Sequence, residues 1–133
     1  PKKSKPLASI AHAIIHDEYQ KRQVIDFIQR MRDAIAINPN GYPHPASEYF
    51  QRSLGRALVL DQSVNAPGNL RSSLKRAIDT LISRHQGLSG DPTQWGAQRS
   101  QYESELTQIY GTTRNMVDAT LRYNNLNNLL GGS

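Results

Sequence analysis

Apolar residues recur at helical spacing along most of this chain, beginning close to its N-terminal end. Between residues 7 and 37 they fall three or four positions apart, which is the spacing of one buried helix face. Mostly polar residues at positions 16–23 separate two such stripes. The pattern predicts either one long helix with an exposed middle or two helices joined by a bend. The two stripes are Leu7, Ile10 and Ile14, and then Val24, Ile28, Met31 and Ile35.

Proline and glycine divide the next part of the chain. Residues 38–45 contain three prolines and an Asn-Gly pair, which cannot continue a helix, and residues 65–69 contain a Pro-Gly pair. We therefore expect helices over residues 46–62 and 70–86, with Gly87 ending the second in a left-handed conformation. Their apolar stripes are Phe50, Leu54, Ala57 and Leu58, and then Leu70, Leu74, Ala77, Ile78, Leu81 and Ile82.

A further apolar stripe extends over most of the C-terminal part. Asp91-Pro92 is typical of a helix start, because a side-chain acceptor is followed by proline. A continuous helix over residues 92–130 would be about 58 Å long, which exceeds the diameter of a domain of this size. It therefore either bends, with Gly111 as the candidate position, or projects and is covered by another subunit. We predict its stripe as a self-assembly surface: Trp95, Tyr102, Leu106, Ile109, Met116, Tyr123 and Leu130.

The predicted fold class is all-α, because no segment alternates apolar and polar residues as a strand does. We expect a helical bundle of four to five helices with a long C-terminal helix or helix pair. Residues 1–6 hold three lysines and two prolines and form a basic flexible arm, and residues 7–133 form a single helical domain. The longest apolar run is far shorter than the about 20 residues of a spanning helix, so we expect no membrane span and no signal peptide.

The charge of the chain is positive and unevenly distributed. Sixteen Lys and Arg against eleven Asp and Glu give +5; residues 1–86 hold thirteen basic and seven acidic side chains, and residues 87–133 hold three and four. The difference predicts a polyanion as partner of the first part and protein contacts for the second. Eleven arginines against five lysines favour phosphate contact, because a guanidinium binds phosphate with two hydrogen bonds.

The sequence offers little that would support catalysis or a metal site. Cysteine is absent, which excludes thiolate metal sites and cysteine nucleophiles. His12 and His16 have the spacing of a zinc helix, but Ala13 replaces the usual glutamate, so we interpret them as surface histidines. Acidic residues mostly have a basic neighbour one turn away, as in Lys75–Asp79 and the series Arg114, Asp118 and Arg122, which predicts surface ion pairs. We expect no enzyme, catalytic residue, metal or cofactor.

Basic residues on the arm and on three predicted helices instead indicate nucleic acid as a partner. No helix-turn-helix, zinc-finger or aromatic RNA-binding pattern indicates readout of base sequence. We therefore expect sequence-independent phosphate contacts, with double-stranded DNA favoured and single-stranded RNA as the other candidate. The candidate nucleic-acid-binding residues are Lys2, Lys3, Lys5, Lys21, Arg22, Arg30, Arg32, Arg52, Arg56, Arg71, Lys75 and Arg76.

The small, cysteine-free, helical chain with its basic arm, its many Asn and Gln, and its long striped C-terminal segment resembles a family of viral coat proteins. These are the major coat proteins of filamentous and rod-shaped archaeal double-stranded DNA viruses. The resemblance implies a helical-bundle subunit that dimerises with itself or with a paralogous coat protein. It also implies that the subunit wraps DNA in A-form and resides in a helical virion. The residues that match the family in type are Lys2, Lys3, Lys5, Arg22, Arg30, Arg52, Arg56, Arg71 and Lys75.

Two shorter likenesses and one further class remain as alternatives. Thr113-Arg114 and residues 117–120 are similar to a stretch in the coat proteins of rod-shaped plant viruses, which package single-stranded RNA. Asp91-Pro92, Tyr102 and the apolar end at residues 129–130 are similar to the polymerising helix of type III secretion or flagellar rod and needle subunits, which lack a basic arm. The further class is a non-polymerising DNA-binding accessory protein.

Overall fold

The computed structural model describes the backbone of residues 6–131 and the side chains of residues 18–131. Within that range there is no strand, and the predicted all-α class is confirmed. None of the described helices is long and apolar enough to cross a membrane. Three short 3₁₀ helices lie between the α-helices: η1 (Pro67–Asn69), η2 (Pro92–Gln94) and η3 (Gly96–Gln98). The α-helices are α1 (Pro6–Ile35), α2 (Ala46–Tyr49), α3 (Ser53–Asn65), α4 (Leu70–Arg84), α5 (Arg99–Thr113) and α6 (Ala119–Leu130).

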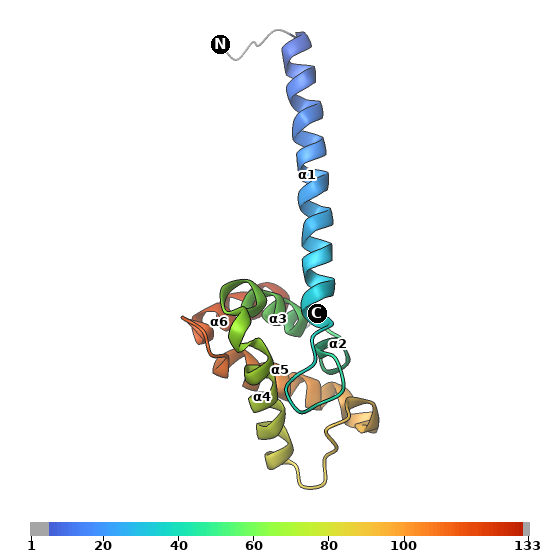
Figure 1. Ribbon diagram of the computed structural model, residues 1–133, viewed down its shortest axis with the longest axis vertical. Helices are drawn as coiled ribbons and strands as arrows, with labels where there is room; N and C mark the ends of the chain where they lie inside the picture. Colours follow the sequence, from blue (N-terminus) through green and yellow to red (C-terminus); the bar gives the residue numbers. More distant parts are fainter. Residues whose placement is uncertain (1–5, 132–133) are drawn as a thin grey trace.

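Figure 1 shows α1 extending away from a body formed by the other helices. It is one helix of 30 residues, about 45 Å long, so the alternative with a bend does not apply. Its last turns pack on α3, where Ala34 is 3% exposed and Met31 and Ile35 are half-buried. Val24 and Ile28 are 58% and 43% exposed, so their predicted burial within the chain is wrong. At these positions α1 has passed the edge of the body.

The core of the body lies between α3, α4 and α5. The predicted stripe of α4 is confirmed: five of its six residues are buried and Ile82 is half-buried. Gly87 has a φ of 83°, which confirms the predicted left-handed end after this helix. The largest completely buried apolar side chains of the core are Tyr49, Phe50, Leu58, Leu70, Leu74, Ile78, Leu81, Leu106 and Tyr110.

The helix predicted over residues 46–62 is interrupted. Phe50 and Arg52 have extended backbone, and they separate α2 from α3. The carboxylate of Glu103 on α5 accepts hydrogen bonds from the backbone N–H groups of Gln51 and Arg52, at 2.9 and 2.8 Å. These bonds satisfy two amides at the start of α3, which a continuous helix would have satisfied locally. Phe50 itself turns inward against Gly55, where a Cβ atom would lie 2.4 Å from its ring.

The C-terminal segment forms a pair of helices and not one projecting helix. The chain reverses over residues 114–118, where Asp118 has a left-handed φ of 57°, and α6 packs back against α3 and α5. Gly111 does not bend the chain; it lies within α5, where a Cβ atom would be 2.2 Å from the ring of Tyr123. Asp91 accepts a hydrogen bond from the N–H of Thr93, as a capping residue does, but it opens η2 and α5 begins only at residue 99.

The self-assembly surface predicted on this segment is therefore wrong in its premise, because the chain itself covers the stripe. Trp95, Leu106 and Ile109 are buried in the core, at 5% exposure or less. The hairpin of α5 and α6 halves the length of the stripe and folds it onto α3 and α4. The remaining predicted members are half-buried: Tyr102, Met116, Tyr123 and Leu130.

Candidate assembly and nucleic-acid surfaces

Of the nine exposed large apolar side chains among the described residues, five lie on α1. Every residue from 18 to 30 is exposed, including Tyr19 and Ile25. Val24, Phe27 and Ile28 lie on one side of this helix, next to Met31, which touches the body. Exposed apolar side chains that form a contiguous face indicate a surface for a protein or membrane partner.

The charges of α1 balance. The helix carries four basic residues, at positions 21, 22, 30 and 32, and four acidic ones, at positions 17, 18, 26 and 33, so its net charge is zero. Lys21 lies 3.7 Å from Glu18. Arg22, Arg30 and Arg32 are exposed but are interleaved with acidic residues around the helix. A neutral helix with an apolar side fits another protein surface better than it fits a polyanion.

Two grooves flank the foot of α1, where it meets α3. The α3–α6 groove, of about 480 Å³, lies on one side and is mainly apolar. Its lining residues are Phe27, Ala57, Leu60, Asp61, Arg122, Asn125, Leu126 and Leu130. The α3–α4 groove, of about 440 Å³, lies on the other side and carries two charged residues of α1. Its lining residues are Arg30, Asp33, Ala34, Ile37, Ser63, Val64, Pro67 and Leu70.

The predicted basic residues of the body divide into two groups. Arg56 is half-buried, and its guanidinium donates to the backbone oxygens of Phe50 and Ser47, at 2.7 and 3.3 Å. Arg52 is exposed and donates to Ser104 Oγ at 3.1 Å. Both side chains therefore hold the segment between α2, α3 and α5 together, a role that their spacing alone did not indicate.

The second group lies on the exposed side of α4. Arg71 donates to the backbone oxygen of Asn38 at 3.0 Å, and Lys75 Nζ lies 2.5 Å from Asp79 Oδ2, which confirms that predicted ion pair. Arg76 is exposed and lines a shallow polar groove along α4 together with Lys75 and Asp79. Among the predicted cations, the structure brings Lys75 and Arg76 of α4 together in this groove. Lys2, Lys3 and Lys5 of the arm lie outside the described residues.

Sequence spacing missed the main charged cluster of the body. The predicted ion pairs of Arg114 and Arg122 with Asp118 are wrong. Both guanidinium groups instead lie against Asp61 of α3, at 3.0 and 2.6 Å. The Arg114 side chain is completely buried and also donates to the backbone oxygens of residues 58, 111 and 119. Burial raises the pKa of Asp61, but the hydrogen bonds from Arg122 and Arg114 outweigh it and hold that pKa below its ordinary value.

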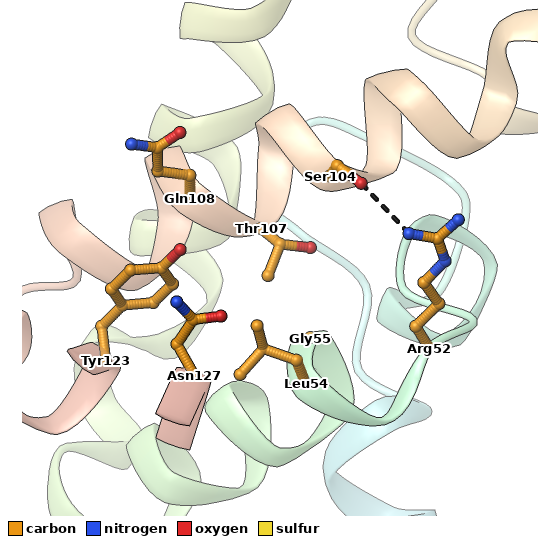
Figure 2. Close-up of a pocket in the computed structure, with 8 residues that line it drawn as sticks. All are labelled: Arg52, Leu54, Gly55, Ser104, Thr107, Gln108, Tyr123 and Asn127. Carbon is orange, nitrogen blue, oxygen red and sulfur yellow. Dashed lines mark hydrogen bonds between the residues drawn. The ribbon is translucent and has the colours of Figure 1, made fainter. Parts of the chain in front are cut away.

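A polar cleft of about 180 Å³ lies between α3, α5 and α6. Figure 2 shows the side chains of Thr107, Gln108, Tyr123 and Asn127 around it, with Arg52 at one end bonded to Ser104. None of its lining residues is acidic or a histidine. Among the described residues, no cluster of three His, Cys, Asp or Glu could hold a metal ion, and the side chains of His12 and His16 lie outside those described. The cleft offers hydrogen-bond partners for a neutral polar group.

Comparison with known proteins adds no relative: no protein-family model, no curated protein and no solved structure matches the chain.

Proposed function

We propose that this protein is a structural subunit that assembles with copies of itself into a helical filament, with α1 as the main contact. The observation that carries the proposal is the exposure of every α1 residue from 18 to 30, among them Val24, Phe27 and Ile28. A helix of this length draws most of its stability from packing of its apolar face, and the body of the same chain leaves residues 18–30 exposed, approaching only their end at Phe27 and Arg30. A second copy supplies the missing cover.

Nucleic acid is the proposed cargo of the filament, which makes the subunit a coat protein of a virion. The support is charge: residues 1–5 contribute +3, and residues 36–86 hold six basic and three acidic side chains, another +3. Within the second part, Arg71, Lys75 and Arg76 are exposed on α4, and Lys75 and Arg76 line the same shallow groove. Phosphate contacts without base selection fit this arrangement, with double-stranded DNA ahead of single-stranded RNA.

The rival class of rod or needle subunits loses its support in the structure. That likeness rested on residues 92–130 as a polymerising helix, and Leu106 and Ile109 of this segment are buried in the chain's own core. An accessory protein that binds DNA without polymerising would not need the exposed apolar face of α1. Such a protein would form no filaments, and light scattering would show a small species in solution.

The experiment that tests assembly compares two variants with equal added charge. Val24→Asp with Ile28→Asp places two carboxylates on the apolar side of α1, and the expected result is loss of filaments in negative-stain microscopy and a monomer in light scattering. The matched control is Val117→Asp with Leu121→Asp, which alters two exposed apolar residues away from α1 and is expected to leave assembly intact. Equal behaviour of the two variants, or a monomeric wild type, would overturn the proposal.

Nucleic-acid binding is tested by its salt dependence. If phosphates are neutralised on B-form DNA, the logarithm of the affinity falls by roughly 0.9 for each phosphate and each log unit of salt. Arg71→Gln with Arg76→Gln is expected to lower both the affinity and this slope, whereas Arg84→Gln, on the same helix and paired with Glu105, is expected to change neither as much. An affinity independent of salt, or a strong preference for one base sequence, would contradict the proposal.

A further inference from the structure

The first third of α1 differs in chemistry from the rest of the helix. Residues 6–15 contain no Asp, Glu, Lys or Arg, whereas seven of the residues from 18 to 33 are charged. Leu7, Ile10 and Ile14 recur in this tip segment at helical spacing. A helical segment without charge needs an apolar surface to cover it, because water alone does not stabilise it.

The body of the same chain is out of reach of the tip segment. Its middle lies twenty residues before Met31, the point at which α1 meets the body, which corresponds to about 30 Å along the helix axis. Figure 1 shows the helix straight over this distance, pointing away from the body. While α1 remains one helix, the surface that covers the tip must come from another molecule, and a second copy of this chain is one that offers such a surface.

The α3–α6 groove is the surface whose chemistry fits this segment. Phe27, Leu60 and Leu126 give it apolar walls, and its two charged residues, Asp61 and Arg122, are already bonded to each other. An uncharged helix can therefore enter without leaving a buried charge unpaired. The α3–α4 groove fits less well, because the charges of Arg30 and Asp33 lie along its edge.

We propose that the tip segment of α1, residues 6–15, lies in the α3–α6 groove of a second copy of this chain. The inference rests on the proposed function and adds a second contact to the one proposed at residues 18–30, with Phe27 of that stretch on the wall of the groove. Because the tip and the groove are different surfaces, each subunit donates one tip and accepts another. Such a head-to-tail contact does not stop at a dimer, and it generates a helical filament when the rotation does not close a ring. The length of α1 then sets the spacing of neighbouring bodies.

Complementation between two defective variants tests this contact. Ile10→Asp with Ile14→Asp spoils the tip and leaves the groove intact. Ala57→Lys fills the groove with a long charged side chain and leaves the tip intact; Leu126→Asp is the second groove variant, used if the first fails to fold by circular dichroism. Each variant alone is expected to be a monomer. Mixed in equal amounts, a tip variant and a groove variant are expected to form a heterodimer of about 30 kDa, twice the 14.9 kDa chain, because one good tip meets one good groove.

The control places the same two charges on the other side of the tip. The control variant is Ser9→Asp with His16→Asp. Helical spacing places these two positions opposite the stripe of Leu7, Ile10 and Ile14, so this variant is expected to assemble like the wild type. The tip-in-groove contact would be overturned if a tip variant or a groove variant formed filaments alone, or if their mixture stayed monomeric or grew into filaments. In each of these cases, filaments of the wild type would still support the proposed function. A monomeric wild type would overturn the proposed function itself.

Discussion

α1 and the body follow the same sequence pattern and end in opposite environments. Val24 and Ile28 recur on α1 much as Leu74 and Ile78 recur on α4, but the first pair is exposed and the second is buried. The difference is the presence of a complementary surface in the same chain: α4 lies against α5, whereas residues 18–30 remain exposed and only Phe27 and Arg30 among them line grooves of the body. Amphipathic spacing therefore shows that a face requires cover and does not show which chain provides it.

The two regions also differ in how they use charge. Among residues 18–131, every buried side-chain polar atom has a hydrogen-bond partner, and Arg114 alone reaches four acceptor groups. The charges of α1 between residues 18 and 30 lie at the surface. We expect the body to depend on its internal pairs and to be indifferent to the projecting part of α1.

The largest expected effect is on the body, from Asp61→Asn. The amide cannot neutralise the completely buried guanidinium of Arg114, so the free energy of unfolding should fall by about 3 kcal/mol. Chemical denaturation measures it. The control is Asp79→Asn, which breaks the exposed pair with Lys75 and should cost less than about 1 kcal/mol. Equal losses of unfolding free energy in the two variants would show that burial does not make the Asp61–Arg114 pair contribute more to stability than the exposed pair.

The next effect tests the close contact between α5 and α6. Gly111→Ala brings a Cβ atom to 2.2 Å from the ring of Tyr123, and overpacking of this kind costs about 2 kcal/mol. In an open helix the same change would stabilise, because alanine favours helix more than glycine does. Gly68→Ala, which meets nothing within 4 Å, is the control and should be nearly neutral. A Gly111 variant more stable than the wild type would show that α6 moves away freely.

A smaller effect concerns acid. The pKa of Asp61 is lower in the folded protein than its usual value, so this carboxylate adds stability above about pH 3.9, the value for an unfolded chain. That stability is lost as the pH falls through the lower folded pKa. Unfolding free energies measured between pH 6 and 2.5 should therefore fall more steeply for the wild type than for Asp61→Asn. If the unfolding free energies of the two proteins fell in parallel with pH, the pKa of Asp61 would be the same in the folded and the unfolded protein.

The smallest expected effect on stability comes from removing most of α1. Deleting residues 1–26 removes a segment whose described side chains, those of residues 18–26, are all exposed, so the unfolding free energy of the body should change by less than about 0.5 kcal/mol. Assembly should disappear in the same protein, as light scattering would show. A body that unfolds on truncation would mean that α1 belongs to its core, and the contrast between the two regions would fail.

The parts of the fold that were predictable are those decided by neighbouring residues. The stripe of α4 and the left-handed Gly87 are local signals, and both were predicted correctly. The break before α3 depends on Glu103, more than fifty residues away along the chain, and no local pattern marks it. The hairpin of α5 and α6 was missed for a related reason: the apolar spacing continues across residues 114–118, so the turn leaves no gap in the stripe.

The candidate surfaces were predictable only as residue types. Spacing identified Arg56 and Arg71 as helix-surface cations, but it could not show that their guanidinium groups donate to backbone oxygens of residues 50 and 38. The excess of arginine over lysine, which we took as a sign of phosphate contact, is partly explained by Arg56 and Arg114 binding the chain itself. The exposed face of α1 required the structure, because only the arrangement of the body shows which part of a stripe remains uncovered.

If the proposed filament forms through α1 and carries nucleic acid, the charge balance of α1 predicts opposite responses of the filament wall and of its cargo to ionic strength. A contact made by a helix of zero net charge and an apolar side loses little to screening, and salts such as sulfate strengthen apolar burial. Contacts between cations and phosphates weaken steeply under the same conditions. Rising salt would therefore release the nucleic acid and leave an empty tube standing, and dilution would allow the same tube to be refilled.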